Sequence, residues 1–194
     1  MSNFIVVLLV AAGAQAQMLP GGPISAYQLR HPLTRKAAKL IEKAQRLAHA
    51  GNHVEAILEL EKALAEPSAV PYARSLLGVE YLKTGQPDRA FTELESAVAL
   101  LPNAAENHAN LGYVLCLRGE LAQAEASIRR ALALNPGSPQ SRYLLGFVLL
   151  QRGGSEKEAL ALLESARHAV PSAARLLDAY RARQAASAGA ASPL

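Results

Sequence analysis

Apolar residues recur along most of the chain at a spacing near 3.6 residues, with polar residues between them. This pattern predicts amphipathic helices of about fourteen residues that are joined by short turns. The predicted helices come in pairs over residues 37–173, and residues 172–184 add one more helix with Leu176, Leu177 and Tyr180 on one face. The chain is therefore expected to be all-α.

The predicted helix pairs repeat with a period of 34 residues. A glycine marks the middle of each unit: Gly51, Gly85, Gly119 and Gly153. Seven residues earlier there is a small residue: Ala44, Gly78, Gly112 and Gly146. Each unit closes with a proline: Pro67, Pro102, Pro136 and Pro171. We expect the middle glycine to end the first helix, the small residue to let the second helix approach closely, and the proline to stop that helix.

The best-preserved unit, residues 105–138 (AENHANLGYVLCLRGELAQAEASIRRALALNPGS), resembles the tetratricopeptide repeat (TPR) family over its whole length. The resemblance implies an α-solenoid, a right-handed superhelix of antiparallel helix pairs, with a capping helix at its end. Its units would be 37–70, 71–104, 105–138 and 139–173, followed by the cap at 172–184 and a flexible tail at 185–194. Thr34 is a candidate N-cap for the first helix.

The N-terminal residues predict an export signal. An apolar run over residues 4–12 is followed by the small residues Ala14 and Ala16, which is the pattern that signal peptidase recognises, although no Lys or Arg precedes the run. Cleavage after Ala16 would make residues 1–16 a signal peptide and place the protein in the periplasm or outside the cell. Residues 17–36 are predicted to form an irregular linker because they contain several prolines and glycines. If the run is instead a buried helix, the protein is a cytoplasmic adaptor.

The resemblance also implies where a partner would bind, because the first helices of such units line the concave side of the superhelix. The matching places that we select as a partner-binding groove are Ile41, Gln45, Tyr72, Val79, Leu82, Lys83, Tyr113, Cys116, Leu117, Tyr143, Phe147 and Leu150. Few residues of the chain are aromatic, only 5%, and four of them fall in this set. Aromatic side chains dominate many protein interfaces, so the predicted ligand is an apolar peptide or an amphipathic helix. The alternative is that these rings pack between neighbouring units.

The remaining chemistry predicts no catalytic residue, no cofactor and no metal, so the protein is not expected to be an enzyme. His49 and His53 are four residues apart, but Gly51 lies between them at a predicted turn, and we expect both side chains to be solvated. Cys116 is expected to be a packing residue and not a nucleophile. The net charge of +4 is spread along the chain, which argues against a nucleic-acid partner, and the N-terminal apolar run is too short for a stable membrane span.

Two functions remain open from the sequence. The first is a binding module or scaffold in the bacterial cell envelope that holds a protein or peptide partner. The second is self-assembly, in which the groove receives an N-terminal segment of a neighbouring copy, such as residues 26–29. In the resembling family some domains clamp a C-terminal carboxylate with Lys, Asn and Arg, but of the matching places here only Asn110 could contribute.

Overall fold

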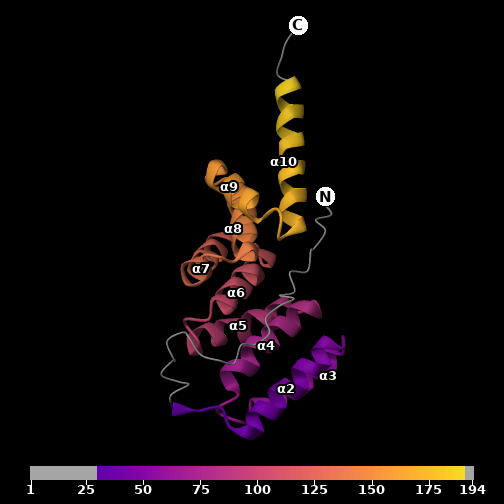
Figure 1. Ribbon diagram of the computed structural model, residues 1–194, viewed down its shortest axis with the longest axis vertical. Coiled ribbons are helices and arrows are strands. Elements are labelled where there is room, and N and C mark those ends of the chain that lie inside the picture. The colour runs from indigo at the N-terminus through magenta and orange to yellow at the C-terminus, as the bar shows by residue number, and fades with distance from the viewer. Residues whose placement is uncertain (1–29, 191–194) are drawn as a thin grey trace.

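The computed structural model describes residues 30–190, and its regular elements are helices (Figure 1). They are α2 (Arg35–His49), α3 (His53–Ala63), α4 (Val70–Lys83), α5 (Pro87–Leu100), α6 (Ala105–Leu117), α7 (Leu121–Leu134), α8 (Pro139–Arg152), α9 (Glu156–Ala166) and α10 (Pro171–Ala190). The predicted signal peptide and most of the predicted linker lie outside the described residues.

Consecutive helices pack as four pairs, α2 with α3 through α8 with α9, and each pair packs against the next. Figure 1 shows these pairs following one another along the long axis, from α2 and α3 at one end to α10 at the other. The structure is therefore an all-α solenoid, as the sequence predicts.

The helix ends follow from local chemistry. Thr34 is the N-cap of α2, because its Oγ1 accepts a hydrogen bond of 3.1 Å from the backbone N–H of Ala37. The first helix of every pair is followed by a glycine with positive φ: Gly51 (82°), Gly85 (72°), Gly119 (78°) and Gly153 (67°). Other residues rarely adopt this left-handed conformation, so the predicted role of these glycines is confirmed.

In three of the four pairs, a glycine on the first helix faces a large aliphatic side chain on the second. A Cβ added at Gly146 would lie 2.8 Å from Leu163 Cγ and 3.0 Å from the carbonyl oxygen of Ala159. Gly78 meets Leu94 and Gly112 meets Ile128 in the same way. The predicted close approach of the second helix is therefore confirmed, and it depends on the missing side chains.

The apolar core runs along the solenoid as three successive clusters of buried side chains. The first lies around Leu60 and Leu77, the second around Ile128 and Leu145, and the third around Leu163 and Leu177. The third cluster joins α9 to α10, so α10 covers the apolar end of the last pair.

The capping helix is longer than predicted. We expected a helix over residues 172–184 and a flexible tail over 185–194, whereas α10 runs from Pro171 to Ala190. Residues 185–190 are mostly alanine, which has the highest helix propensity, so the helix continues beyond the packed part. At the other end α2 begins at Arg35, two residues inside the predicted linker.

His53 does not behave as the solvated turn residue that we expected. Its Nδ1 lies 2.7 Å from Oε2 of Glu80, whose side chain belongs to α4 and is only 3% exposed. Lys83 Nζ donates to the other oxygen of that carboxylate at 2.7 Å. Burying a carboxylate is costly unless it is hydrogen-bonded and paired, so His53 and Lys83 together stabilise Glu80 at the junction of the first two pairs.

The small residues at the pair contacts can be tested on α7, where Ala131 is fully buried and Ala133 is exposed. We expect Ala131→Leu to lower the free energy of unfolding by about 1–3 kcal/mol, because the added side chain overpacks the contact. Ala133→Leu is the matched control, with the same change in helix propensity and no change in the core. Urea unfolding followed by circular dichroism measures both, and equal midpoints for the two variants would contradict the register of the repeats.

The pairing of Glu80 can be tested through its imidazole partner. His53→Ala should lower the free energy of unfolding by about 1–3 kcal/mol, because it leaves a buried carboxylate oxygen without its hydrogen bond. His49→Ala is the control, since His49 is exposed at the end of α2. If thermal unfolding does not distinguish the two alanine variants, the contact between His53 and Glu80 does not stabilise the junction.

Candidate functional site: a surface on the first helices

The predicted groove residues lie on the first helices of the pairs, and the structure divides them by burial. Ile41 is only 1% exposed and belongs to the same apolar cluster as Leu60 and Leu77, so its assignment as a partner-binding residue is wrong. Removing an aliphatic side chain from water stabilises the fold, so Ile41 contributes to the core and is not accessible to a partner. The others are half-buried, except Leu117, which is 44% exposed.

The aromatic residues of the set do not form one continuous cluster. Tyr72 packs against the first core cluster, as does Leu82. The second core cluster carries a different group of half-buried residues, which we call the tyrosine surface: Tyr113, Cys116, Tyr143, Phe147 and Leu150. The structure therefore places the ring-rich part of the predicted groove on α6 and α8. Val79, Gln45 and Lys83 lie on the earlier helices α2 and α4, and Lys83 is engaged with Glu80.

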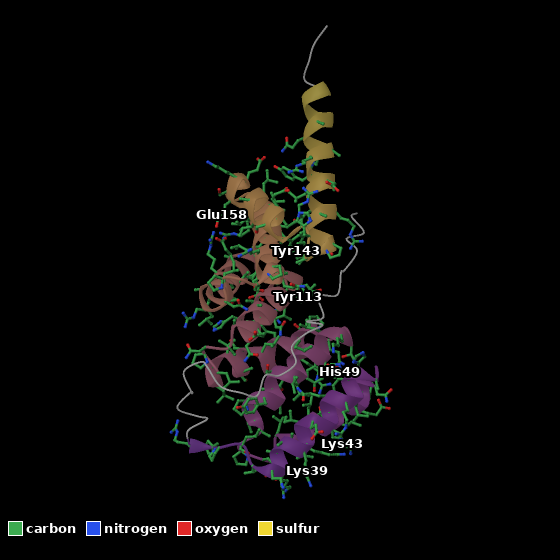
Figure 2. The ribbon with its side chains drawn as sticks, in the orientation of Figure 1. Lys39, Lys43, His49, Tyr113, Tyr143 and Glu158 are labelled. Atoms are coloured by element: carbon green, nitrogen blue, oxygen red, sulfur yellow. The ribbon has the colours of Figure 1, made fainter. Side chains whose placement is uncertain are left out.

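Tyr113 and Tyr143 are electrostatic neighbours within the tyrosine surface. Partial burial raises the pKa of both phenols, and the proximity of Tyr143 raises the pKa of Tyr113 further. Figure 2 labels the two residues on adjacent helices, in the middle of the solenoid. Both phenols are therefore protonated at neutral pH and can act as hydrogen-bond donors.

The hydroxyl groups of these two tyrosines are unused. Tyr81 donates to a carboxylate oxygen of Glu61 at 2.9 Å, and Tyr180 accepts from Gln184 at 2.9 Å. In contrast, neither Tyr113 nor Tyr143 has a hydrogen bond to any residue that the structure describes. Tyrosine hydroxyls normally find a partner when the ring is buried, so these two groups are available to water or to a ligand.

Cys116, which belongs to α6, packs against the second core cluster, as Tyr113 and Tyr143 do. Burial raises the pKa of its thiol to about 12, so the thiolate is scarce at neutral pH. This is opposite to the lowered pKa of a nucleophilic cysteine and agrees with the role that the sequence suggested.

Sequence analysis missed the contribution of α10 to this surface. Tyr143 packs against the third core cluster as well as the second, and the positive charge of Arg175 on α10 acts on its phenol. Arg175 is exposed and donates from Nη2 to Ser172 Oγ at 3.2 Å. The sequence does contain a signal for the contribution of α10. Tyr143 lies four residues after the first residue of α8, and Arg175 lies four residues after Pro171, the first residue of α10.

Asn107 is a second polar residue that the repeat pattern does not reveal. It is 2% exposed, and its Oδ1 accepts a hydrogen bond from Ser75 Oγ across α4 and α6. Its Nδ2 has no partner among the described residues. The side chain links two first helices beneath the surface and is not itself accessible to a ligand.

Metal sites and membrane-spanning helices are two other features that bear on function. Between residues 30 and 190, no group of three or more His, Cys, Asp and Glu side chains is arranged to hold a metal ion. In the same part of the chain, none of the helices has the length and apolar character needed to cross a membrane.

The fold is shared by several solved structures. MamA residues 41-end from Desulfovibrio magneticus RS-1 align with a TM-score of 0.61 at 23% identity, over 68% of this chain and 74% of that chain. The first TPR domain of Spaghetti (RPAP3) bound to the HSP90 peptide SRMEEVD aligns with a TM-score of 0.60 at 21% identity, over 64% and 98%. The O-GlcNAc transferase of Thermobaculum terrenum, a K341M mutant, aligns with a TM-score of 0.61 at 28% identity, over 70% of this chain but only 27% of that chain.

Among curated proteins, none matches this sequence significantly. The family model of the tetratricopeptide repeat matches residues 75–139 and 118–174, which together cover half of the chain. These matched segments contain the tyrosine surface and the glycines that end α4, α6 and α8. The chain therefore belongs to the tetratricopeptide repeat family.

Proposed function

We propose that this protein is a non-catalytic interaction module that binds an apolar peptide or helix on the tyrosine surface. The observation that supports it best is the group of half-buried rings on α6 and α8, two of which, Tyr113 and Tyr143, carry unused phenol hydroxyls. Rigid rings with one polar end are the side chains that protein interfaces use most effectively. A solved relative of similar fold, the RPAP3 domain, holds a peptide.

The proposed place of action is the bacterial cell envelope. The apolar run at residues 4–12 and the small residues Ala14 and Ala16 support export. A solenoid that is stabilised by stacking, with a single cysteine, does not depend on disulfides and suits either side of the inner membrane. The proposed location in the envelope therefore rests on the N-terminal sequence alone.

Export predicts that the protein recovered from the envelope fraction begins at Gln17. Intact-mass measurement of the full-length gene product from that fraction gives the N-terminus directly. Ala16→Lys should block cleavage and leave Met1 in place, because the peptidase needs a small residue there. Ala11→Gly is the control, because it changes a small residue away from the cleavage site. Recovery of the unaltered chain with Met1 retained, in the cytoplasmic fraction, would contradict export.

If the tyrosine surface is the binding site, capture of a partner should require its aromatic rings. Pull-down from envelope extract with the full chain should capture a protein that Tyr113→Ala/Phe147→Ala does not capture, because the double change removes most of the apolar contact area. Val54→Ala/Leu58→Ala is the control, since it removes two exposed apolar side chains from α3.

Circular dichroism of both double variants separates loss of binding from loss of the fold. If the ring variant is folded and captures the same protein as the unaltered chain, the tyrosine surface is not the binding site. If it is unfolded, the rings act in the core and the assignment of the surface fails.

A further inference from the structure

Two exposed side chains on α3 are large and apolar. Among the described residues, the large apolar side chains that are exposed are Val54 (64%), Leu58 (51%) and Leu117 (44%). Val54 and Leu58 are four residues apart on one helix, so they are neighbours on the same face. The buried side chains of α3, such as Leu60 and Ala63, lie on its opposite face. We call Val54 and Leu58 the α3 patch.

The repeat provides a reference for these two places. In the later pairs they hold exposed side chains that are charged, polar or small: Asp88 and Thr92 on α5, Ala122 and Ala126 on α7, and Lys157 and Ala161 on α9. Both places are thus solvated in this fold, and only the first pair puts large apolar side chains there. Removing these side chains from water is favourable, so the α3 patch suits an apolar occupant.

The chain enters the first pair close to α3. The backbone N–H of Thr34 donates to Ser68 Oγ at 3.2 Å, and Lys36 Nζ lies 2.5 Å from Glu66 Oε1. Ser68 and Glu66 belong to the turn that follows α3, so the residues before α2 arrive beside the C-terminal end of α3. Leu33 already packs against the first core cluster.

This entry point is within reach of the α3 patch. Leu58 precedes Ala63, the last residue of α3, by five residues, which is roughly 8 Å along the helix axis. The five residues that follow Leu29 up to Thr34 span roughly 17 Å when they are extended. Residues that precede Thr34 by five to ten positions can therefore contact Leu58.

We infer that residues 18–29, which lie outside the described part of the chain, dock on the α3 patch of the same molecule through Ile24, Tyr27 and Leu29. This segment contains apolar side chains and no carboxylate, so the exposed Glu55 beside Val54 does not repel it. It follows the predicted cleavage site at Ala16, so it is present in the cleaved and in the uncleaved chain.

The size of the α3 patch favours a tethered occupant over a separate molecule. Each partner of a stable complex buries roughly 800 Å², which is much more than two side chains can expose. A segment that is joined to α2 needs less contact area, because the tether gives it an effective concentration on the order of millimolar. Docking would hold the N-terminal segment on the first pair, at the end of the solenoid opposite α10 (Figure 1).

The test places the photocrosslinking amino acid p-benzoylphenylalanine at position 27 of the full chain, where it replaces another aromatic side chain. Irradiation and mass spectrometry of proteolytic peptides should give an adduct between residue 27 and α3, in a product with the mass of one chain. Val54→Ser/Leu58→Ser should lose this adduct, because the patch is then polar. Ala122→Ser/Ala126→Ser is the matched control, since it changes the same places of the third pair, and it should keep the adduct.

A second variant changes the segment instead of the helix. Ile24→Ser/Leu29→Ser should also lose the adduct, and its substitutions lie outside the helices of the solenoid. Circular dichroism of the serine variants verifies that loss of the adduct is not loss of the fold. If Val54→Ser/Leu58→Ser is unfolded, Ile24→Ser/Leu29→Ser decides the result.

Three outcomes would overturn docking within one chain. They are an adduct that maps to a helix other than α3, an adduct that survives in the folded serine variants of the patch or the segment, and the absence of any adduct. A product with twice the mass of the chain would also overturn it, because the segment then binds a second copy. None of these outcomes bears on the tyrosine surface, which lies on α6 and α8 and is tested by capture of a partner.

Discussion

The fold depends on the contact between a missing side chain on one helix and a branched side chain on the next. Gly78, Gly112 and Gly146 leave no room for a Cβ because the aliphatic groups of α5, α7 and α9 fill that space. This contact fixes the separation and the rotation of the two helices in each pair. Once the pairs are rigid, they can stack only through the faces that remain, and the core becomes a line of clusters along the solenoid.

The same constraint explains why the rings of the tyrosine surface are half-buried. A first helix gives one face to its partner and another to the neighbouring first helix, so the side chains between them are covered on one side only. Tyr113 and Tyr143 pack their rings on the second core cluster and keep their hydroxyls free of protein partners. The hydroxyls and the uncovered edges of these rings are therefore the parts that are left for a partner. A ring that is already held by its neighbours loses little conformational entropy when a ligand docks.

The sequence predicted the features that a few neighbouring residues decide and that recur in every unit. The glycine that ends each first helix, the small residue at each pair contact and the cap at Thr34 are decided by a few adjacent positions, and all have the expected geometry. The contact of His53 with Glu80 joins residues of different units, and no local rule specifies it. The assignment of Ile41 to the groove fails for a related reason. The periodicity gives the place of Ile41 in the unit but not which neighbouring side chains cover it. The candidate site was predicted in part, since its rings follow the period while Arg175 lies in a helix that the sequence suggested only as a cap.

The capping helix illustrates how a structural requirement can also shape a site. The end of a solenoid must be covered, and α10 does this by repeating the buried spacing of α8, with Ala173 and Leu177 in the places of Ser141 and Leu145. A helix that repeats this spacing also repeats the place that Tyr143 holds, and there α10 carries Arg175. The first helices of earlier pairs put an apolar or small polar side chain at this place, whereas the cap puts a cation there. The cap therefore brings a positive charge to Tyr143, at the place where the first helices of the pairs hold an uncharged side chain.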